Sequence, residues 1–529
     1  MNPKLNFRFA ATWLVTVFFF MLLSPKWLFS LAAWIAPALL VRLLLPLKPL
    51  KIFWFGYSAL VVSSLIGNYK VMPFPVPILV IMVLVTSLFA ALPYLINALV
   101  WSRLAGFRKT FILPVAMVTY EYLNSFGGGG TWGSMAYSQM DNLYFIQLAS
   151  VTGIWGITFL MFWFASILNW TIEENFAWRV IQKPVFSFLF ITGGVFLFGA
   201  IRTNSYFDSP REVVRVAGVT ALNLDPIMAM YRDAFGKEME VDPERLTQTS
   251  PELAELNKGF AAFIEDPYHP KFEQTRSVIE NFQDNLFAIS DREAKAGAKI
   301  ITWSEALVFT IKADEERLIS KGKKFAIDNK IYFLLTMGSI LPGQIKTGKK
   351  FIENKAILIN PDGVVENVFF KNKPVPVVEP SVPGDGRIPL ITTPYGRVSP
   401  SICYDADFPA LMQQTGEQQT DILLLPSGDW REVSPYHGNM ARMRAIENGF
   451  SMFRMVSGAT SMACDSRGRM IASKNFYDKG AKVLVADLPT KGTGTVYQVV
   501  GDSFVFLSVI GLAVGLIMAF RRRTENARR

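Results

Sequence analysis

Residues 398–409 read Val-Ser-Pro-Ser-Ile-Cys-Tyr-Asp-Ala-Asp-Phe-Pro, a short apolar run that ends in a thiol and an acidic turn. The run Val398–Cys403 has the length and apolar character of a buried strand. Two other predicted strands also end in reactive side chains, Glu305 and Lys371. Active-site residues on α/β scaffolds gather at strand ends. A lone buried cysteine is usually a small hydrophobe, but an acid, a cation and a thiol together are the parts of acyl transfer without histidine.

Around this stretch, strands and helices alternate over residues 213–488, which predicts an α/β sandwich with embedded hairpins. The expected helices are Phe272–Ala296, Leu318–Asn329 and His437–Gly449. The expected strands are Val213–Val219, Lys299–Trp303, Ile331–Gly338, Ala356–Ile359, Val364–Phe369, Val398–Cys403, Ile422–Pro426, Ser461–Asp465, Met470–Ser473 and Lys482–Leu488.

A long insertion, Asp225–Pro270, separates the first strand from the first helix and is rich in Glu, Asp, Pro and Thr. Its mixed periodicity predicts a long loop with some helix, suited to a mobile arm better than to a packed core. It is either a lid or binding arm, or a solvated decoration. Since it holds none of the three reactive residues, a binding arm here should act on an acceptor substrate rather than on the chemistry.

Apolar runs with few charges fill most of the remaining chain, which is 51% hydrophobic and 18% charged overall. Most of these runs approach the ~20 residues that a helix needs to cross a bilayer. We count eight spans, and the first should be a retained signal anchor because no small-residue cleavage pattern follows it. The spans lie within Phe9–Pro25, Trp27–Leu45, Ile52–Asn68, Val71–Val100, Phe111–Phe126, Leu143–Trp170, Pro184–Ile201 and Ser503–Phe520.

The distribution of basic residues predicts the topology. An even number of spans places both termini on one side, and basic residues mark the cytoplasmic side. The short loops opposite the termini hold only Lys26 and Lys70, so residues 202–502 should lie outside. The fifteen basic residues on the side of the termini are Lys4, Arg8, Arg42, Lys48, Lys51, Arg103, Arg108, Lys109, Arg179, Lys183, Arg521, Arg522, Arg523, Arg528 and Arg529.

The net charge of +10 therefore reports topology and not a nucleic-acid surface. The fifteen basic residues and the acidic Glu173, Glu174 and Glu525 give the cytoplasmic side a net charge of +12. The rest of the chain therefore has a net charge of −2. We expect three parts in the chain. They are a seven-span domain over residues 1–201, an outer catalytic domain over 202–502 with its arm at 225–270, and a last span with a basic tail over 503–529.

Histidines and cysteines are scarce, which limits the possible chemistry. The two histidines, His269 and His437, give a metal site or a Ser-His-Asp triad little to draw on, and we expect no metal and no cofactor. His437 opens a predicted helix, where a structural or substrate-lining role is favoured over that of a base. The two cysteines, Cys403 and Cys464, are expected to stay unbridged, because a disulfide would consume the thiol at the strand end.

Longer motifs resemble those of the nitrilase superfamily. Residues 371–379 resemble its lysine motif, residues 401–409 its cysteine elbow, and Asp429-Trp430 with residues 437–448 the helix that follows the elbow. A nitrilase-like domain between spans seven and eight is similar to the apolipoprotein N-acyltransferase family. Glu121, Tyr137-Ser138-Gln139 and Gly153-Ile154-Trp155-Gly156 resemble spans five and six of that family.

The resemblance implies roles for individual residues. Cys403 would be the nucleophile and Glu305 the general base, while Lys371 would stabilise the oxyanion and favour the thiolate. Glu379 would support the site, and Tyr404 and Asp405 would lie beside the nucleophile. The chain departs from the family pattern at Ser304 (usually Pro), at Val377-Val378 (Phe-Gly), at Asp405 (Glu) and at Ala221-Leu222-Asn223 (Gln-Gly-Asn).

The implied activity is N-acylation of lipoproteins at a bacterial inner membrane, with the catalytic domain on the outer side. The acyl group would pass from a phospholipid through a cysteine thioester to the amine of a diacylglyceryl-cysteine. Drawing a sixteen-carbon chain into water costs on the order of 12 kcal/mol, so such an enzyme must keep the chain in an apolar site at the bilayer. A membrane-tethered nitrilase or amidase, or an idle lipoprotein- or lipid-binding scaffold, are the alternatives.

Overall fold

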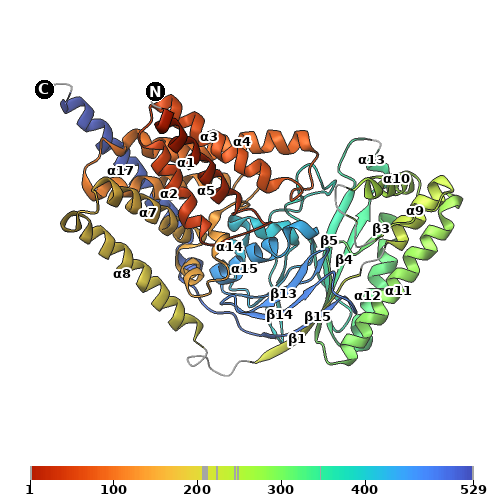
Figure 1. The fold of residues 1–529 in the computed structure, drawn as a ribbon. Helices are drawn as coiled ribbons and strands as arrows, with labels where there is room; N and C mark the ends of the chain where they lie inside the picture. The colour runs from red at the N-terminus through yellow and green to blue at the C-terminus, as the bar shows by residue number, and fades with distance from the viewer. Residues whose placement is uncertain are drawn as a thin grey trace. The chain divides into compact units, whose positions relative to one another are not determined.

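The computed structural model describes residues 3–204, 212–221, 224–242, 246, 250–345 and 347–526. Leu222 and Asn223, at the expected end of the first strand, and residues 243–245 and 247–249 of the insertion lie outside this set. The chain forms two compact units, which we call the helical unit (Met1–Phe207 with Thr495–Arg529) and the sandwich unit (Asp208–Gly494). Figure 1 shows both.

The helical unit has a helix in each of the eight apolar segments predicted above. Five of its described helices, α3, α4, α7, α8 and α17, are long and apolar enough to cross a membrane. Helices α1 and α2 are apolar but shorter, and α5 has 13 residues, so eight spans stay a prediction. The long helices are α1 (Pro3–Met21), α2 (Ala32–Leu44), α3 (Pro49–Asn68), α4 (Val76–Trp101), α5 (Ile112–Asn124), α7 (Ile154–Glu173), α8 (Trp178–Thr203) and α17 (Ser503–Asn526).

Helix α7 forms the centre of the helical unit. It packs against α2 and α5, and residues on all of its faces are buried, including Trp155, Phe162 and Ala165. A helix that is apolar all round is stable only when it is enclosed, as α7 is here. Short segments join the long helices: η1 (Gly106–Phe111), η2 (Met135–Gln139), η3 (Phe145–Leu148), α6 (Ala149–Thr152) and α16 (Val496–Val500).

The sandwich unit contains two large mixed sheets. The first runs β15-β1-β2-β4-β5-β6 with β3 also paired to β4, and the second runs β14-β13-β11-β9-β8-β7. The strands of the first are β1 (Val213–Val219), β2 (Ile300–Trp303), β3 (Val308–Ile311), β4 (Tyr332–Ile340), β5 (Ile352–Ile359), β6 (Val365–Phe370) and β15 (Val483–Pro489). Those of the second are β7 (Ile391–Thr393), β8 (Gly396–Pro400), β9 (Ile422–Leu424), β11 (Ser451–Arg454), β13 (Thr460–Cys464) and β14 (Met470–Asn475).

Helices cover the outer face of each sheet, which makes four layers and confirms the predicted α/β sandwich (Figure 1). Between the sheets, Val216 and Leu334 of the first pack with Ile422, Leu424 and Phe453 of the second. The helices on the first sheet are α11 (Glu273–Lys295) and α12 (Glu315–Asn329), and those on the second are α14 (Pro409–Glu417) and α15 (Tyr436–Asn448).

The insertion differs from the mobile arm that the sequence predicted. Its described part contains the helices α9 (Asp225–Phe235) and α10 (Pro251–Glu265). Met230 and Phe263 of these helices are buried in one cluster with Ile311 of β3 and Ile340 of β4. Each buried apolar side chain of this kind stabilises the packed state by about 1.5–3 kcal/mol. The insertion is therefore a helical hairpin packed on the sandwich, because its sparse apolar residues fall on the inner faces of two helices.

Gly218 of β1 tests how closely the sheets pack. A Cβ atom there would lie 2.6 Å from Phe453 Cε1 and 2.7 Å from Met455 Sδ. Overpacking of this kind costs roughly 1–3 kcal/mol, so Gly218→Ala should lower the thermal midpoint of the purified protein. Gly343→Ala is the matched control, because no atom lies within 4 Å of its added methyl. Equal midpoints for both variants would contradict this account of the core.

Candidate active site

Three strand ends of the sandwich unit bring the acid, the cation and the thiol together. Glu305 lies two residues beyond β2, Lys371 directly follows β6, and Cys403 opens the short helix η7 (Cys403–Asp407) after β8. Strands β2 and β6 belong to the first sheet and β8 to the second. The site therefore forms where the ends of the two sheets meet, as the sequence predicted for these three residues.

Lys371 lies between two carboxylates and is fully buried. Its Nζ donates to Glu305 Oε1 at 2.7 Å and to Glu379 Oε1 at 2.5 Å. Burial alone would lower the pKa of Lys371, but the charges of Glu305, Cys403 and Glu379 raise it well above its ordinary value. The pKa of Glu379 is raised by burial, against the opposing effect of Lys371. The lysine is thus a fixed cation at neutral pH.

Glu305 accepts hydrogen bonds on both of its oxygens. Oε1 accepts from Asn354 Nδ2 at 2.7 Å in addition to Lys371, and Oε2 accepts from the backbone N–H of Gly428 at 2.7 Å. Three donors orient the carboxylate while its side chain is only 7% exposed. Hydrogen bonding of this kind holds a charged group in one position inside a low-dielectric site.

The peptide unit at Gly428 also connects the base to the nucleophile. The Gly428 carbonyl accepts from Cys403 Sγ at 3.6 Å, while the N–H of the same residue donates to Glu305. Gly428 belongs to a short parallel pair of β10 (Ser427–Gly428) and β12 (Val456–Ser457). A Cβ atom at this position would lie 3.4 Å from both Glu305 Oε2 and Ser457 Oγ, so the Gly428 backbone lies directly against the carboxylate.

Cys403 adopts a backbone conformation that few side chains tolerate. Its φ is +47°, in the left-handed region that costs a non-glycine residue roughly 1–3 kcal/mol. This sharp turn after β8 aims the thiol back toward Gly428. Burial and the charge of Glu305 raise the pKa of the Cys403 thiol well above its ordinary value, although Lys371 opposes them. Lys371 lowers the pKa of the thiol, as expected, but burial and the charge of Glu305 outweigh this effect.

Asp405 and Tyr404 follow the nucleophile in η7. Asp405 is fully buried, and its carboxylate accepts from the backbone N–H of Lys373 at 2.7 Å and of Ile402 at 3.1 Å. Burial raises the pKa of Asp405 to about 7, although Lys371 and the backbone donors favour the anion. Its bonds tie the turn that carries Cys403 to the segment after Lys371. The ring of Tyr404 packs edge-on against that of Phe408, with 5.3 Å between the ring centroids.

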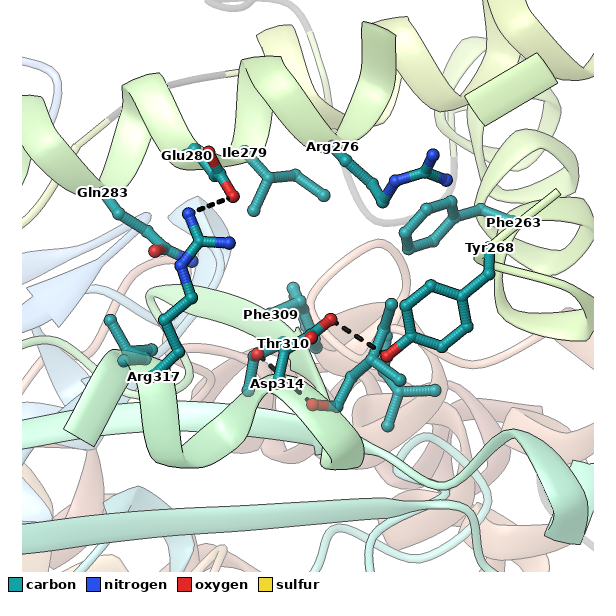
Figure 2. Close-up of a pocket in the computed structure, with 13 residues that line it drawn as sticks. Phe263, Tyr268, Arg276, Ile279, Glu280, Gln283, Phe309, Thr310, Asp314 and Arg317 are labelled. Atoms are coloured by element: carbon teal, nitrogen blue, oxygen red, sulfur yellow. Dashed lines mark hydrogen bonds and ion pairs between the residues drawn. The ribbon is translucent and has the colours of Figure 1, made fainter. Parts of the chain in front are cut away.

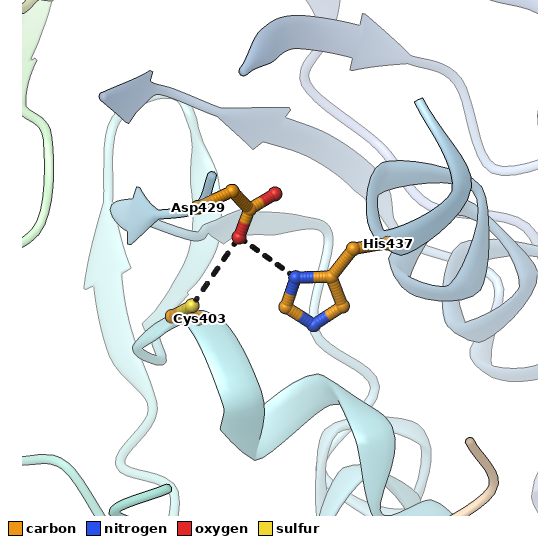
Figure 3. A group of neighbouring side chains, drawn as sticks. All are labelled: Cys403, Asp429 and His437. Atoms are coloured by element: carbon orange, nitrogen blue, oxygen red, sulfur yellow. Dashed lines mark hydrogen bonds and ion pairs between the residues drawn. The ribbon is translucent and has the colours of Figure 1, made fainter. Parts of the chain in front are cut away.

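A second buried ionic cluster adjoins the thiol, and Figure 3 shows two of its members, Asp429 and His437, beside Cys403. Asp429 Oδ1 is 3.8 Å from Cys403 Sγ and 2.7 Å from His437 Nδ1. His437 Nε2 is 2.9 Å from Asp407 Oδ1, and Arg454 Nη2 donates to both oxygens of Asp429 at 3.0 and 2.9 Å. Two cations thus face two carboxylates within the core.

The charges of this cluster reinforce one another. Burial would lower the pKa of His437, but Asp407 and Asp429 raise it to about 10. Burial would raise the pKa of Asp429, but Arg454 and His437 hold it below its ordinary range. His437 is therefore an imidazolium at neutral pH, which fits the structural role that the sequence favoured over that of a base.

Cys403, Asp429 and His437 have ligand atoms within 4.8 Å of one another, the spacing of a metal site. The chemistry of these groups does not fit a metal ion. Both ring nitrogens of His437 contact carboxylates, and Arg454 contacts both oxygens of Asp429. An imidazolium has no lone pair to offer a metal, so this cluster is an ion-pair network.

Sequence reasoning missed Asp407, Asp429 and Arg454 as parts of the site. Asp407 lies four residues after Cys403, in a turn with three acidic or hydroxyl side chains. That density of polar groups next to the thiol could have marked Asp407 as a site residue. Arg454 lies in β11, a strand that was not predicted. Asp429 and Arg454 reach the thiol only through the pairing of β10 with β12 and of β9 with β11. Cys403 and Cys464 are both unbridged, as expected.

Comparisons with known proteins agree along most of the chain. Residues 7–167 match the family model described as the apolipoprotein N-acyltransferase N-terminal domain, and residues 270–498 match that of carbon-nitrogen hydrolase. An apolipoprotein N-acyltransferase of Geobacter metallireducens is 26% identical, with 93% of this chain and 91% of that protein covered. Apolipoprotein N-acyltransferase 1 of Treponema denticola is 25% identical, with 96% of each covered. A solved amidase from Nesterenkonia sp. is 17% identical with a TM-score of 0.37, covering 54% of this chain and 95% of its own.

The raised pKa of His437 predicts how stability depends on pH. A group whose pKa is higher in the folded state stabilises the fold fully below its unfolded value of about 6.5 and loses that effect as pH rises through the folded value. His437→Gln should lower stability at pH 7 by about 3–5 kcal/mol, because it removes the imidazolium that the buried Asp407 and Asp429 carboxylates share. The difference between wild type and variant should shrink as the pH rises from about 7 to about 10, between the unfolded and folded pKa values of His437.

Thermal midpoints of both proteins, measured across this pH range, test the prediction. His269→Gln is the matched control, because this second histidine is exposed at the start of η5 (Pro270–Phe272). It should leave the midpoint unchanged at every pH. A difference for His437→Gln that stays constant from about pH 7 to about pH 10 would show that the ring is neutral in the folded protein.

Proposed function

The chain belongs to the apolipoprotein N-acyltransferase family, and on that premise we propose that it moves an acyl chain from a phospholipid to the α-amine of a diacylglyceryl-modified cysteine in a lipoprotein. It is a membrane protein and an acyltransferase with a nitrilase-type domain. The observation that carries the mechanism is the Gly428 peptide, which contacts the Glu305 carboxylate through its N–H and the Cys403 thiol through its carbonyl.

In the first half-reaction, Glu305 takes the proton of Cys403 as the sulfur attacks the carbonyl carbon of a phospholipid ester. Because the resting thiol is protonated, this proton must leave as the C–S bond forms. The negative charge that develops on the ester oxygen is stabilised by the Lys371 ammonium, the fixed cation at the site. The C–O bond then breaks, Glu305 returns the proton to the departing alcohol, and a lysophospholipid leaves a thioester on Cys403.

In the second half-reaction, the amine of the lipoprotein attacks the thioester carbon. Glu305 accepts a proton from the amine, Lys371 stabilises the second oxyanion, and the C–S bond breaks to release an amide. The proton returns to the Cys403 sulfur, so the enzyme regains its starting state. The whole exchange uses side chains alone, with no cofactor.

The remaining site residues act through these three. Glu379 shares the Lys371 ammonium with Glu305 and so holds the lysine in place. Asp405 ties the strained turn at Cys403 to Lys373. Tyr404 lies beside the nucleophile, with its ring against Phe408. Asp429 contacts the thiol at 3.8 Å and helps to orient it.

The proposed location is the inner membrane of a bacterium, with the sandwich unit on the periplasmic side. The support is the asymmetry of basic residues between the short loops, which places the termini in the cytoplasm. A phospholipid donor and a lipid-anchored acceptor would both reach such an enzyme from the outer leaflet.

Substitutions at the thiol and the base should separate the steps of the reaction. Cys403→Ala should abolish turnover, and Cys403→Ser should retain a trace at most. Glu305→Gln should fail to form the acyl-enzyme, with a loss of at least ~10²–10⁴-fold, because an amide cannot accept the thiol proton. The measurement is a thioester assay on denatured protein after incubation with phospholipid labelled in its acyl chain.

Glu366→Gln is the control for Glu305→Gln. The Glu366 side chain is exposed on β6, and its carboxylate accepts a hydrogen bond from Asn360 Nδ2. It should label like wild type. Normal acyl transfer by Cys403→Ala would exclude the thioester, and wild-type labelling of Glu305→Gln would move the role of base to another group. Rapid release of free fatty acid in place of amide would favour the hydrolase alternative.

The topology can be read with reporters. A reporter fused after Arg529 should be active only in the cytoplasm, and one inserted at the exposed turn Thr347-Gly348 only outside. The expectation follows from the fifteen basic residues on one side and two on the other. The reverse pattern would overturn both the orientation and the lipoprotein substrate.

A further inference from the structure

A cavity of about 290 Å³ lies in the sandwich unit where the insertion packs on the first sheet (Figure 2). Phe263 of α10 and the following loop form one end, and α11, β3 and the start of α12 form the remaining walls. None of the residues of the active site lines it. The packed insertion therefore shapes a second hollow, separate from the thiol.

The charged groups at the cavity are already paired. Arg317 contacts Glu280 at 2.5 Å, and the Tyr268 hydroxyl donates to Asp314 at 3.0 Å. Arg276 donates to the backbone carbonyl of Pro267 at 2.8 Å. Figure 2 shows the first two of these pairs, Arg317 with Glu280 and Tyr268 with Asp314. With two guanidiniums and two carboxylates on the wall, the cavity has no net charge with which to select an ion.

One polar side chain that lines the cavity differs from these paired groups. Gln283 of α11 is 7% exposed and lines the hollow. Among the described residues, none forms a hydrogen bond with its amide. An amide that lines a cavity can bond a ligand there in place of water. Because an amide offers donors and an acceptor together, its natural complement is another amide, such as a peptide bond.

The strand at the cavity points to the same kind of ligand. Phe309, Thr310 and Ile311 are consecutive in β3 and all three line the cavity. Side chains alternate between the faces of a strand, so a cavity that touches three in a row reaches the backbone edge. In the described part of the chain, β3 pairs with β4 alone. An unpaired strand edge beside apolar side chains is how extended peptides are commonly bound.

We propose that this cavity binds the polypeptide segment that follows the modified cysteine of the acceptor lipoprotein. The inference rests on the proposed function and adds a peptide subsite to it. Phe309 comes four residues after Glu305, which at about 3.3 Å per residue is at most about 13 Å of chain. An extended acceptor tail of about four residues is therefore long enough to span from Glu305 to Phe309. A single residue after the cysteine spans only about 3.3 Å.

The test uses the full-length protein with phospholipid donor and two diacylglyceryl-cysteine acceptors, one with a single residue after the cysteine and one with about eight. Gln283→Leu keeps the volume of the side chain and removes the amide. It should lower kcat/KM for the long acceptor about tenfold, mainly through KM, as the loss of one or two hydrogen bonds implies. The short acceptor and acyl-thioester formation should change less than twofold.

Two further variants keep the result interpretable. Gln274→Leu makes the same change at an exposed position of α11 and should leave both acceptors unaffected. Ile279→Trp fills the cavity from a half-buried position and should reproduce the selective loss even if Gln283→Leu does not fold. Equal losses for both acceptors, or no loss for either, would overturn the peptide subsite. Absence of thioester formation in wild type would instead contradict the proposed function.

Discussion

The Lys371 ammonium, enclosed between the Glu305 and Glu379 carboxylates, is the interaction on which the rest of the site depends. A cation with no exposure to solvent is stable only if partners offset the lost hydration, which amounts to several kcal/mol per ion. Those partners come from different parts of the sandwich unit: one follows β2 and the other lies eight residues beyond the lysine itself. The first sheet must form from β2 to β6 before the charge is compensated, so this sheet and the site form together.

The pairing also determines what the lysine can do for the thiol. A lone cation beside Cys403 would stabilise the thiolate, but this one faces two carboxylates, and burial adds to their effect on the sulfur. The result is a Cys403 thiol whose pKa is raised although a cation lies beside it. Lys371 can still stabilise an oxyanion, because that charge appears only after the proton has moved to Glu305 and reduced the negative charge around the lysine. The same cation thus contributes more to the transition state than to the resting enzyme.

The sequence predicted the parts of this arrangement that depend on local pattern. Short apolar runs bounded by turn residues located most strands of both sheets to within a few residues, and three reactive side chains at strand ends located the site. Strand β3 was missed because its four residues follow Glu305 closely, and β11 because it contains the buried Arg454. The network of Asp407, Asp429, His437 and Arg454 was not predictable from local pattern either. Its members span more than forty residues of the sequence and meet only because strands pair. The insertion misled because its composition is polar, whereas packing depends on where its few apolar residues lie.

A protonated, buried thiol has a further consequence in the extracytoplasmic setting proposed above. Disulfide formation and oxidation proceed through the thiolate, and the raised pKa of Cys403 keeps that form scarce until a substrate carbonyl is in place. Burial also raises the pKa of Cys464, the second cysteine, to about 12, so neither sulfur is an easy partner for the other. Cys403 is only 3% exposed, and burial of this degree would shield a thioester in the same way, because hydrolysis needs a water molecule where the amine should enter. Burial together with paired charges would thus favour both a reduced cysteine and an acyl group that persists until the acceptor binds.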